Sequence, residues 1–304
     1  MPIQPVGPPA PLVRRNPSSV DEAHIRERAS NPPLTPAPAP STPTGPTAVN
    51  HSRMKVLITG AAGRIGRVLT AGLTNHDLRL TDIAGLDDPR FVRADLSHAE
   101  AVDRAVEGMD AVVHLGAVPD EAPFEEIAGP NLHGTFHVFD ACRRLGARRI
   151  VFASSNHATG MYPVGEPLTE DYPPRPDGLY GASKVWGEAL GRMYVDRFGL
   201  EFVGLRIGTF DAKPPNRRAL ATWLSHDDAV RLVDAALTAP DVGWTVVYGV
   251  SNNTRRWWPL DDAARRIGYE PRDDAETYAD EVTEGPEYER QGGPNTDPAH
   301  GGWA

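Results

Sequence analysis

A continuous apolar run that leads into closely spaced glycines constrains this chain more than any other feature. Residues 55–59 read KVLIT, and Gly60, Gly63 and Gly66 follow before apolar residues recur at helical spacing. A strand, a glycine turn and a helix in this order are typical of the first unit of a dinucleotide-binding sheet. The turn lets the backbone and the free N–H groups of the helix approach a pyrophosphate. The predicted cofactor-binding residues of this turn are Gly60, Gly63, Arg64, Ile65 and Gly66, of which Gly66 lets the helix pack closely on the strand.

Strands and helices alternate along the rest of the chain. Helical spacing of apolar residues is clear at 131–146 and 180–198. This alternation predicts an α/β fold, a doubly wound parallel sheet of the Rossmann type, within residues 54–280. A small C-terminal substrate-binding lobe is expected at about 203–280. The predicted strands are residues 55–59, 78–83, 91–92, 110–116 and 150–155.

The two ends of the chain have a different composition. Residues 1–52 are rich in Pro, Ala, Ser and Thr, and we expect them to be disordered because they cannot bury enough apolar surface to offset their ordering entropy. They are either a proline-rich docking tail or the result of an upstream translation start, since Met54 directly precedes the first strand. Residues 281–304 are also expected to be a disordered tail.

The charge and the cysteine content of the chain limit its possible binding partners and its possible cellular location. The net charge of −10 without a basic block argues against nucleic acid or an anionic membrane surface as a partner. No apolar run approaches the roughly 20 residues that span a bilayer. Cys142 is the only cysteine, so no intramolecular disulfide can form, and we expect it to be a buried structural thiol. The expected location is the cytoplasm.

Acidic residues after the second and third predicted strands indicate the cofactor. Asp82 lies 22 residues beyond Gly60, where a carboxylate can accept hydrogen bonds from the ribose hydroxyls and would repel a 2′-phosphate. This position favours NAD over NADP. Asp95 and Leu96 are expected to hold the adenine edge.

Ser155, Tyr180 and Lys184 form the predicted catalytic group. Tyr180 and Lys184 are four residues apart and share one helical face, and Ser155 ends the central strand at the edge where parallel sheets bind ligands. The predicted chemistry is hydride transfer with Tyr180 as base. A lysine cation ~5 Å away would stabilise the phenolate by roughly 3 kcal/mol, about two pKa units. This chemistry requires no metal.

The strings TGAAGRIG and YGASK, together with Asp82 and Ser155, resemble the extended branch of the short-chain dehydrogenase/reductase superfamily. RIVFASSNHATGMYP, RPDGLYGASK, LRIG, ATWLSHDD, TVVYGVS and WWP are more specific and resemble bacterial uronate dehydrogenases. The resemblance implies NAD-dependent oxidation of the anomeric carbon of glucuronate or galacturonate to an aldarolactone. It also implies homo-oligomers that pack through helices 131–146 and 180–198.

The same resemblance implies further site residues. Ser155, Asn156 and His157 would contact the sugar, and Arg218 would bind the C6 carboxylate through two hydrogen bonds. Thr209 stands where the family has a serine near the nicotinamide. The other cofactor contacts that it implies are Ile83, Leu115, Gly116 and Ala117, along with Tyr180 and Lys184.

The match to uronate dehydrogenases departs from the family pattern at two positions. Pro119 stands where the family typically has a serine that touches substrate, and Phe210 replaces a smaller residue beside the pocket. Both differences affect which substrate the pocket accepts more than which reaction it catalyses. The alternatives are another NAD-dependent aldose or sugar-phosphate dehydrogenase, such as one for glucose 6-phosphate, a nucleotide-sugar epimerase, and a non-catalytic NAD-binding regulator.

Overall fold

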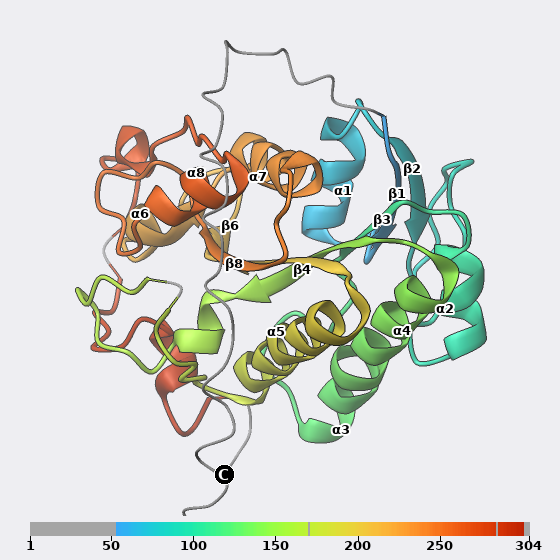
Figure 1. The fold of residues 1–304 in the computed structure, drawn as a ribbon. Helices are drawn as coiled ribbons and strands as arrows, with labels where there is room; N and C mark the ends of the chain where they lie inside the picture. The colour runs from blue at the N-terminus through green and yellow to red at the C-terminus, as the bar shows by residue number, and fades with distance from the viewer. Residues whose placement is uncertain (1–52, 170, 284, 301–304) are drawn as a thin grey trace, which may run out of the picture. The chain divides into compact units, whose positions relative to one another are not determined.

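A six-stranded parallel sheet lies at the centre of the computed structural model, which describes residues 53–169, 171–283 and 285–300 (Figure 1). The predicted disorder of residues 1–52 and of 301–304 lies outside the described residues. In order across the sheet, the strands are β2 (Asp77–Thr81), β1 (Lys55–Thr59), β3 (Ala111–His114), β4 (Arg149–Ser155), β5 (Glu201–Ile207) and β8 (Trp244–Gly249).

Helices cover both faces of this sheet (Figure 1). Along β1, Val56 and Ile58 face one apolar core and Leu57 faces the other, because successive side chains of a strand point to opposite faces. The doubly wound fold is therefore confirmed. One face is covered by α1 (Arg64–Gly72), α7 (His226–Thr238) and α8 (Asp261–Ile267), and the other by α2 (Ala99–Val106), α4 (Thr135–Leu145) and α5 (Leu179–Phe198).

Shorter elements join these layers. The predicted helix at 131–146 begins as a π-helical segment that runs on into α4, and α4 ends at Gly146 in the left-handed conformation. The predicted strand at 91–92 was wrong, because Phe91 forms only an isolated bridge with Leu80. The short elements are α3 (Phe124–Ile127), η3 (Ala128–Gly134), η4 (Asn156–Thr159), β6 (Thr209–Phe210), α6 (Ala219–Thr222), β7 (Trp223–Leu224), η5 (Ala275–Tyr278) and η6 (Gly293–Thr296).

The C-terminal third differs from its prediction in two ways. Within the expected lobe at about 203–280, β5, α7 and β8 belong to the central sheet and its cover, whereas β6 and β7 form a two-stranded sheet of their own. Residues 285–300, expected to be a disordered tail, pack on the fold instead, and Gln291 is completely buried. Composition misled here because burial depends on a few well-placed residues rather than on average hydropathy.

Cys142 lies fully buried in α4, as expected of a structural thiol, and burial raises the pKa of its thiol well above the usual range. Within the residues that the structure describes, no helix is long and apolar enough to cross a membrane.

A buried ion pair joins α5 to β5. The Glu188 carboxylate accepts hydrogen bonds from Arg206 Nη2 at 2.8 Å and from the Ser154 hydroxyl at 2.6 Å. Both side chains of the pair are almost completely buried, so removing one charge leaves the other without a partner in a medium of low polarity.

We therefore expect Glu188→Gln to lower the free energy of unfolding by about 3–5 kcal/mol, measured by urea denaturation. The matched control is Glu281→Gln, which breaks the exposed pair between Lys213 and Glu281. Exposed pairs contribute about 1 kcal/mol or less. Equal losses in the two variants would contradict the prediction.

Candidate active site

A cavity of about 1000 Å³ lies at the carboxyl ends of the strands. The order of the strands changes direction between β1 and β3, and open parallel sheets bind ligands at such a point. Most of the predicted site residues come together here. Those that line the cavity are Gly60, Gly63, Arg64, Ile65, Gly66, Asp82, Ile83, Asp95, Leu96, Leu115, Gly116, Ala117, Ser155, Asn156, His157, Tyr180, Lys184 and Phe210.

The glycine turn brings the backbone of β1 against the backbone after β3. Gly60 has a φ of +69°, and a Cβ at this position would lie 2.8 Å from the Gly116 nitrogen. A Cβ on Gly66 would lie 2.4 Å from the Gly60 oxygen. No side chain caps α1, which begins directly after the extended Gly63. The start of this helix is thus open to a phosphate group, and the turn fits the pyrophosphate of NAD.

Asp82 stands just beyond the end of β2. Its carboxylate accepts hydrogen bonds from the backbone nitrogens of Ala62 and Ala84, each at 2.9 Å. These two bonds fix the carboxylate at the edge of the cavity next to the glycine turn. A negative charge in this position fits a ribose with free hydroxyls and disfavours a 2′-phosphate.

Replacing Asp82 is expected to erode the preference for NAD over NADP. Asp82→Ala removes a charge-assisted contact of about 1.5–3 kcal/mol, so the ratio of the two kcat/KM values should fall roughly ten- to a hundredfold. Asp88→Ala is the control, because Asp88 binds Arg90 outside the cavity. A wild type with equal efficiency for both cofactors would contradict this interpretation.

Ser155, Tyr180 and Lys184 meet at one end of the cavity. The Lys184 Nζ lies 5.3 Å from the centre of the Tyr180 ring. Burial raises the pKa of Tyr180 to about 12, although a hydrogen bond with Ser155 acts in the opposite direction. Burial also lowers the pKa of Lys184 to about 8. Both shifts come mainly from burial, which disfavours the charged form of each group.

Two polar residues that the sequence did not single out hold the helix of Tyr180 in place. The Glu121 carboxylate accepts hydrogen bonds from the backbone nitrogens of Leu179 at 2.8 Å and Tyr180 at 2.9 Å, which caps α5. The buried Asn131 binds both polar backbone groups of Val118 and the Ser183 hydroxyl. Neither residue stands in a recognisable motif. The groups that they bind lie far from them in the sequence, so spacing along the chain does not indicate these contacts.

The polar run after β4 is fixed by partners of its own. His157 Nδ1 lies 2.7 Å from the buried Asp177 carboxylate, and its ring meets the Tyr180 ring edge-on at 5.8 Å between centroids. The Asn156 amide, in the orientation that satisfies both its groups, donates to the Ile207 carbonyl at 3.1 Å and accepts from Arg218 at 3.2 Å. Sequence spacing did not reveal the pair of His157 and Asp177.

Thr209 and Arg218 are the two predicted site residues that do not line the cavity. The Thr209 hydroxyl lies 2.8 Å from that of Thr222, and Arg218 stands behind Asn156. Burial lowers the pKa of the Arg218 guanidinium to about 10. Pro119 does line the cavity, so its ring, which has no hydroxyl, forms part of the lining.

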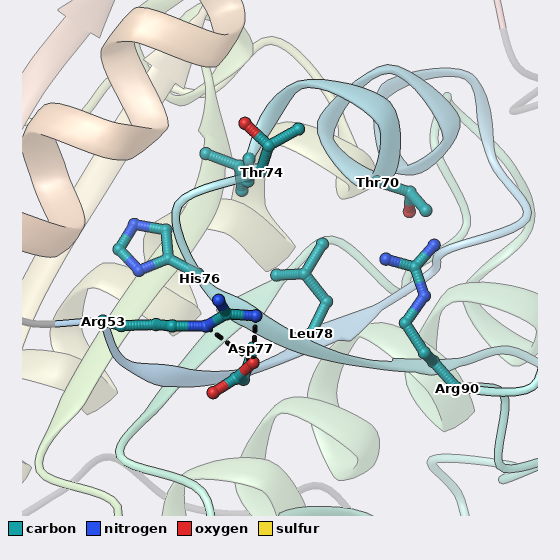
Figure 2. A pocket seen from close by; sticks show the side chains of 8 residues that line it. Arg53, Thr70, Thr74, His76, Asp77, Leu78 and Arg90 are labelled. Carbon is teal, nitrogen blue, oxygen red and sulfur yellow. Dashed lines mark hydrogen bonds and ion pairs between the residues drawn. The ribbon is translucent and has the colours of Figure 1, made fainter.

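A smaller hollow of about 390 Å³ lies at the opposite ends of the strands (Figure 2). Its charged groups are paired, since Arg53 binds Asp77 at 2.8 Å and His76 lies 3.0 Å from Asp234. We therefore assign no part of the active site to this hollow.

Comparisons with known proteins agree with this site. The model of the NAD dependent epimerase/dehydratase family matches residues 56–214. A uronate dehydrogenase from Pseudomonas syringae pv. tomato is 46% identical over 235 residues, which are 75% of this chain and 85% of the relative. A solved variant of uronate dehydrogenase from Agrobacterium tumefaciens, complexed with NAD, covers 81% of this chain and 97% of its own, at a TM-score of 0.76 and 43% identity. An NAD-dependent glucose-6-phosphate dehydrogenase from Haloferax volcanii is 34% identical over 249 residues, 73% of this chain and 95% of the relative. The chain belongs to the NAD dependent epimerase/dehydratase family and, within it, to the uronate dehydrogenases.

Proposed function

We propose that this protein oxidises the anomeric carbon of a hexuronate, glucuronate or galacturonate, with NAD and releases an aldarolactone. The observation that carries the proposal is the meeting of Ser155, Tyr180 and Lys184 at one end of a cavity that also holds the glycine turn and Asp82. The identity to uronate dehydrogenases supports the substrate class.

In this reaction the anomeric carbon loses a hydride and its hydroxyl loses a proton. NAD, when bound, supplies the acceptor for the hydride. Tyr180 takes the proton through its phenolic oxygen, and Ser155 holds the substrate oxygen beside it. Lys184, 5.3 Å from the Tyr180 ring, stabilises the negative charge that develops on the phenol. Among the residues that the structure describes, no three His, Cys, Asp or Glu side chains cluster in a way that could hold a metal ion.

Substrate recognition rests on the polar run and the arginine behind it. Asn156 and His157 contact the hydroxyl groups of the sugar, and Asp177 keeps the His157 ring in one orientation. We assign the C6 carboxylate to Arg218, whose Nη2 donates to Asn156, a residue that lines the cavity. A guanidinium suits a carboxylate because it stays charged and donates charge-assisted hydrogen bonds.

A substrate panel tests the proposal. Glucuronate, galacturonate, glucose and glucose 6-phosphate are supplied with NAD, and reduced cofactor is followed by absorbance. We expect turnover of the uronates and nearly none of glucose. The second candidate is a sugar phosphate, because a guanidinium binds phosphate equally well and the Haloferax volcanii relative is named for glucose 6-phosphate. Turnover of that substrate without the uronates would replace our proposal.

We also propose a homo-oligomer that packs through α4 and α5. Phe136 of α4 and Trp186 and Phe198 of α5 are exposed apolar side chains, which are typical of interaction surfaces when they cluster. The cytoplasmic location stays a prediction.

A further inference from the structure

The C-terminal segment, residues 285–300, lies against the chain that follows the polar run. The backbone nitrogen of Gln291 donates to the Tyr162 carbonyl at 2.9 Å, and that of Gly292 donates to the Gly160 carbonyl at 2.8 Å. On the same segment, Asn295 lies 3.5 Å from Asp120. The segment therefore packs against the chain that follows β4 and against Asp120 of the loop that follows β3, behind the residues that line the cavity.

The side chain of Gln291 holds this residue in place within the segment. It is fully buried, and its amide oxygen accepts from Trp258 Nε1 at 2.7 Å. Its amide nitrogen donates to the carbonyls of Pro163 at 3.0 Å and Glu166 at 2.9 Å. All polar groups of the side chain are bonded, so the Gln291 backbone has one fixed orientation.

The locked backbone holds Arg218. The Gln291 carbonyl accepts a short hydrogen bond from Arg218 Nη2, and the guanidinium lies 5.5 Å from the centre of the Trp257 ring. Gly293 has a φ of +63°, and a Cβ there would lie 3.0 Å from Arg218 Nε. The glycine lets the segment approach the guanidinium closely.

We propose that Gln291 is a positioning residue for the acid group of the substrate, acting through Arg218. The inference rests on the proposed function, because it assigns Arg218 to the carboxylate. The Gln291 carbonyl and the Asn156 oxygen both accept from Arg218 Nη2, and the Thr209 hydroxyl accepts from Nη1 at 3.4 Å. Because arginine has five N–H donors, these three bonds fix the plane of the guanidinium and leave two donors for the substrate. Trp257 and Trp258 serve the same purpose, the first against Arg218 and the second against Gln291.

The test is Gln291→Met, which keeps the volume and removes the side-chain hydrogen bonds. We expect the KM for galacturonate to rise about ten- to a hundredfold, because a misplaced contact group weakens binding, while the KM for NAD stays within about twofold. The control is Glu289→Met, which puts the same side chain at an exposed position of the same segment. Trp258→Phe, which removes one hydrogen bond to Gln291, should raise the KM for galacturonate less.

A double variant separates positioning from general damage. If Gln291 acts through Arg218, Gln291→Met should add almost nothing to the KM of Arg218→Lys. Wild-type turnover of galacturonate tests the proposed function separately. If the wild type turns over galacturonate and Gln291→Met leaves its KM unchanged, the inference falls while the proposed function stands. Parallel losses for galacturonate and NAD would also overturn it, because they would show a purely structural role.

Discussion

Tyr180→Phe is expected to lower kcat for uronate oxidation by about 10²–10⁴-fold, the usual contribution of a positioned base. The phenylalanine ring still fits against His157, so the site keeps its shape and loses only the oxygen that takes the proton. The measurement is initial velocity with galacturonate and NAD, together with NAD binding by fluorescence titration. We expect cofactor affinity to change little.

The pH profile gives a second readout for Tyr180. Because burial raises the pKa of this phenol to about 12, its deprotonated fraction grows with pH across the neutral range, and wild-type kcat should rise with it. The residual activity of Tyr180→Phe should lose that rise. Tyr278→Phe, which removes a phenol that does not line the cavity, is the control. Full activity in Tyr180→Phe would exclude Tyr180 as the base.

Arg218→Lys is expected to cost uronate oxidation about 2–4 kcal/mol, or roughly thirty- to a thousandfold in kcat/KM. A lysine ammonium has no planar set of five donors, so it cannot bind the carboxylate while it keeps the bonds to Gln291 and Asn156. The low efficiency with glucose should change little, since glucose lacks the carboxylate. The measurement is the ratio of uronate to glucose efficiency in each variant.

Arg217→Lys is the matched control, because it makes the same change at the exposed neighbouring position. It should leave the ratio of uronate to glucose efficiency intact. An unchanged ratio in Arg218→Lys would mean that Arg218 does not read the carboxylate.

The sequence predicted those parts of the site that depend on residues close together in the chain. The turn from Gly60 to Gly66, the carboxylate of Asp82 and the helical pair of Tyr180 and Lys184 each follow from a strand end or a helical spacing. The parallel sheet brings these local features to one edge.

What the sequence did not reveal depends on contacts between distant residues. The pairs of His157 with Asp177 and of Gln291 with Arg218 join segments that no periodicity relates. The effect of burial on the pKa of Tyr180 and on that of Lys184 was not predicted, because burial is a property of the packed site. The C-terminal segment was missed for a similar reason, since its composition resembles that of a solvated tail.

The cap that Glu121 places on α5 has a consequence for engineering this enzyme. Glu121 lies on the loop that also carries Pro119 to the cavity, so the loop near the substrate is tied to the helix of the base. An exchange of residues 117–123 that removes Glu121 would leave the start of α5, and with it the backbone of Tyr180, without this cap. Grafting this loop from a relative to admit a different sugar should therefore succeed only if the new loop brings a carboxylate that caps α5.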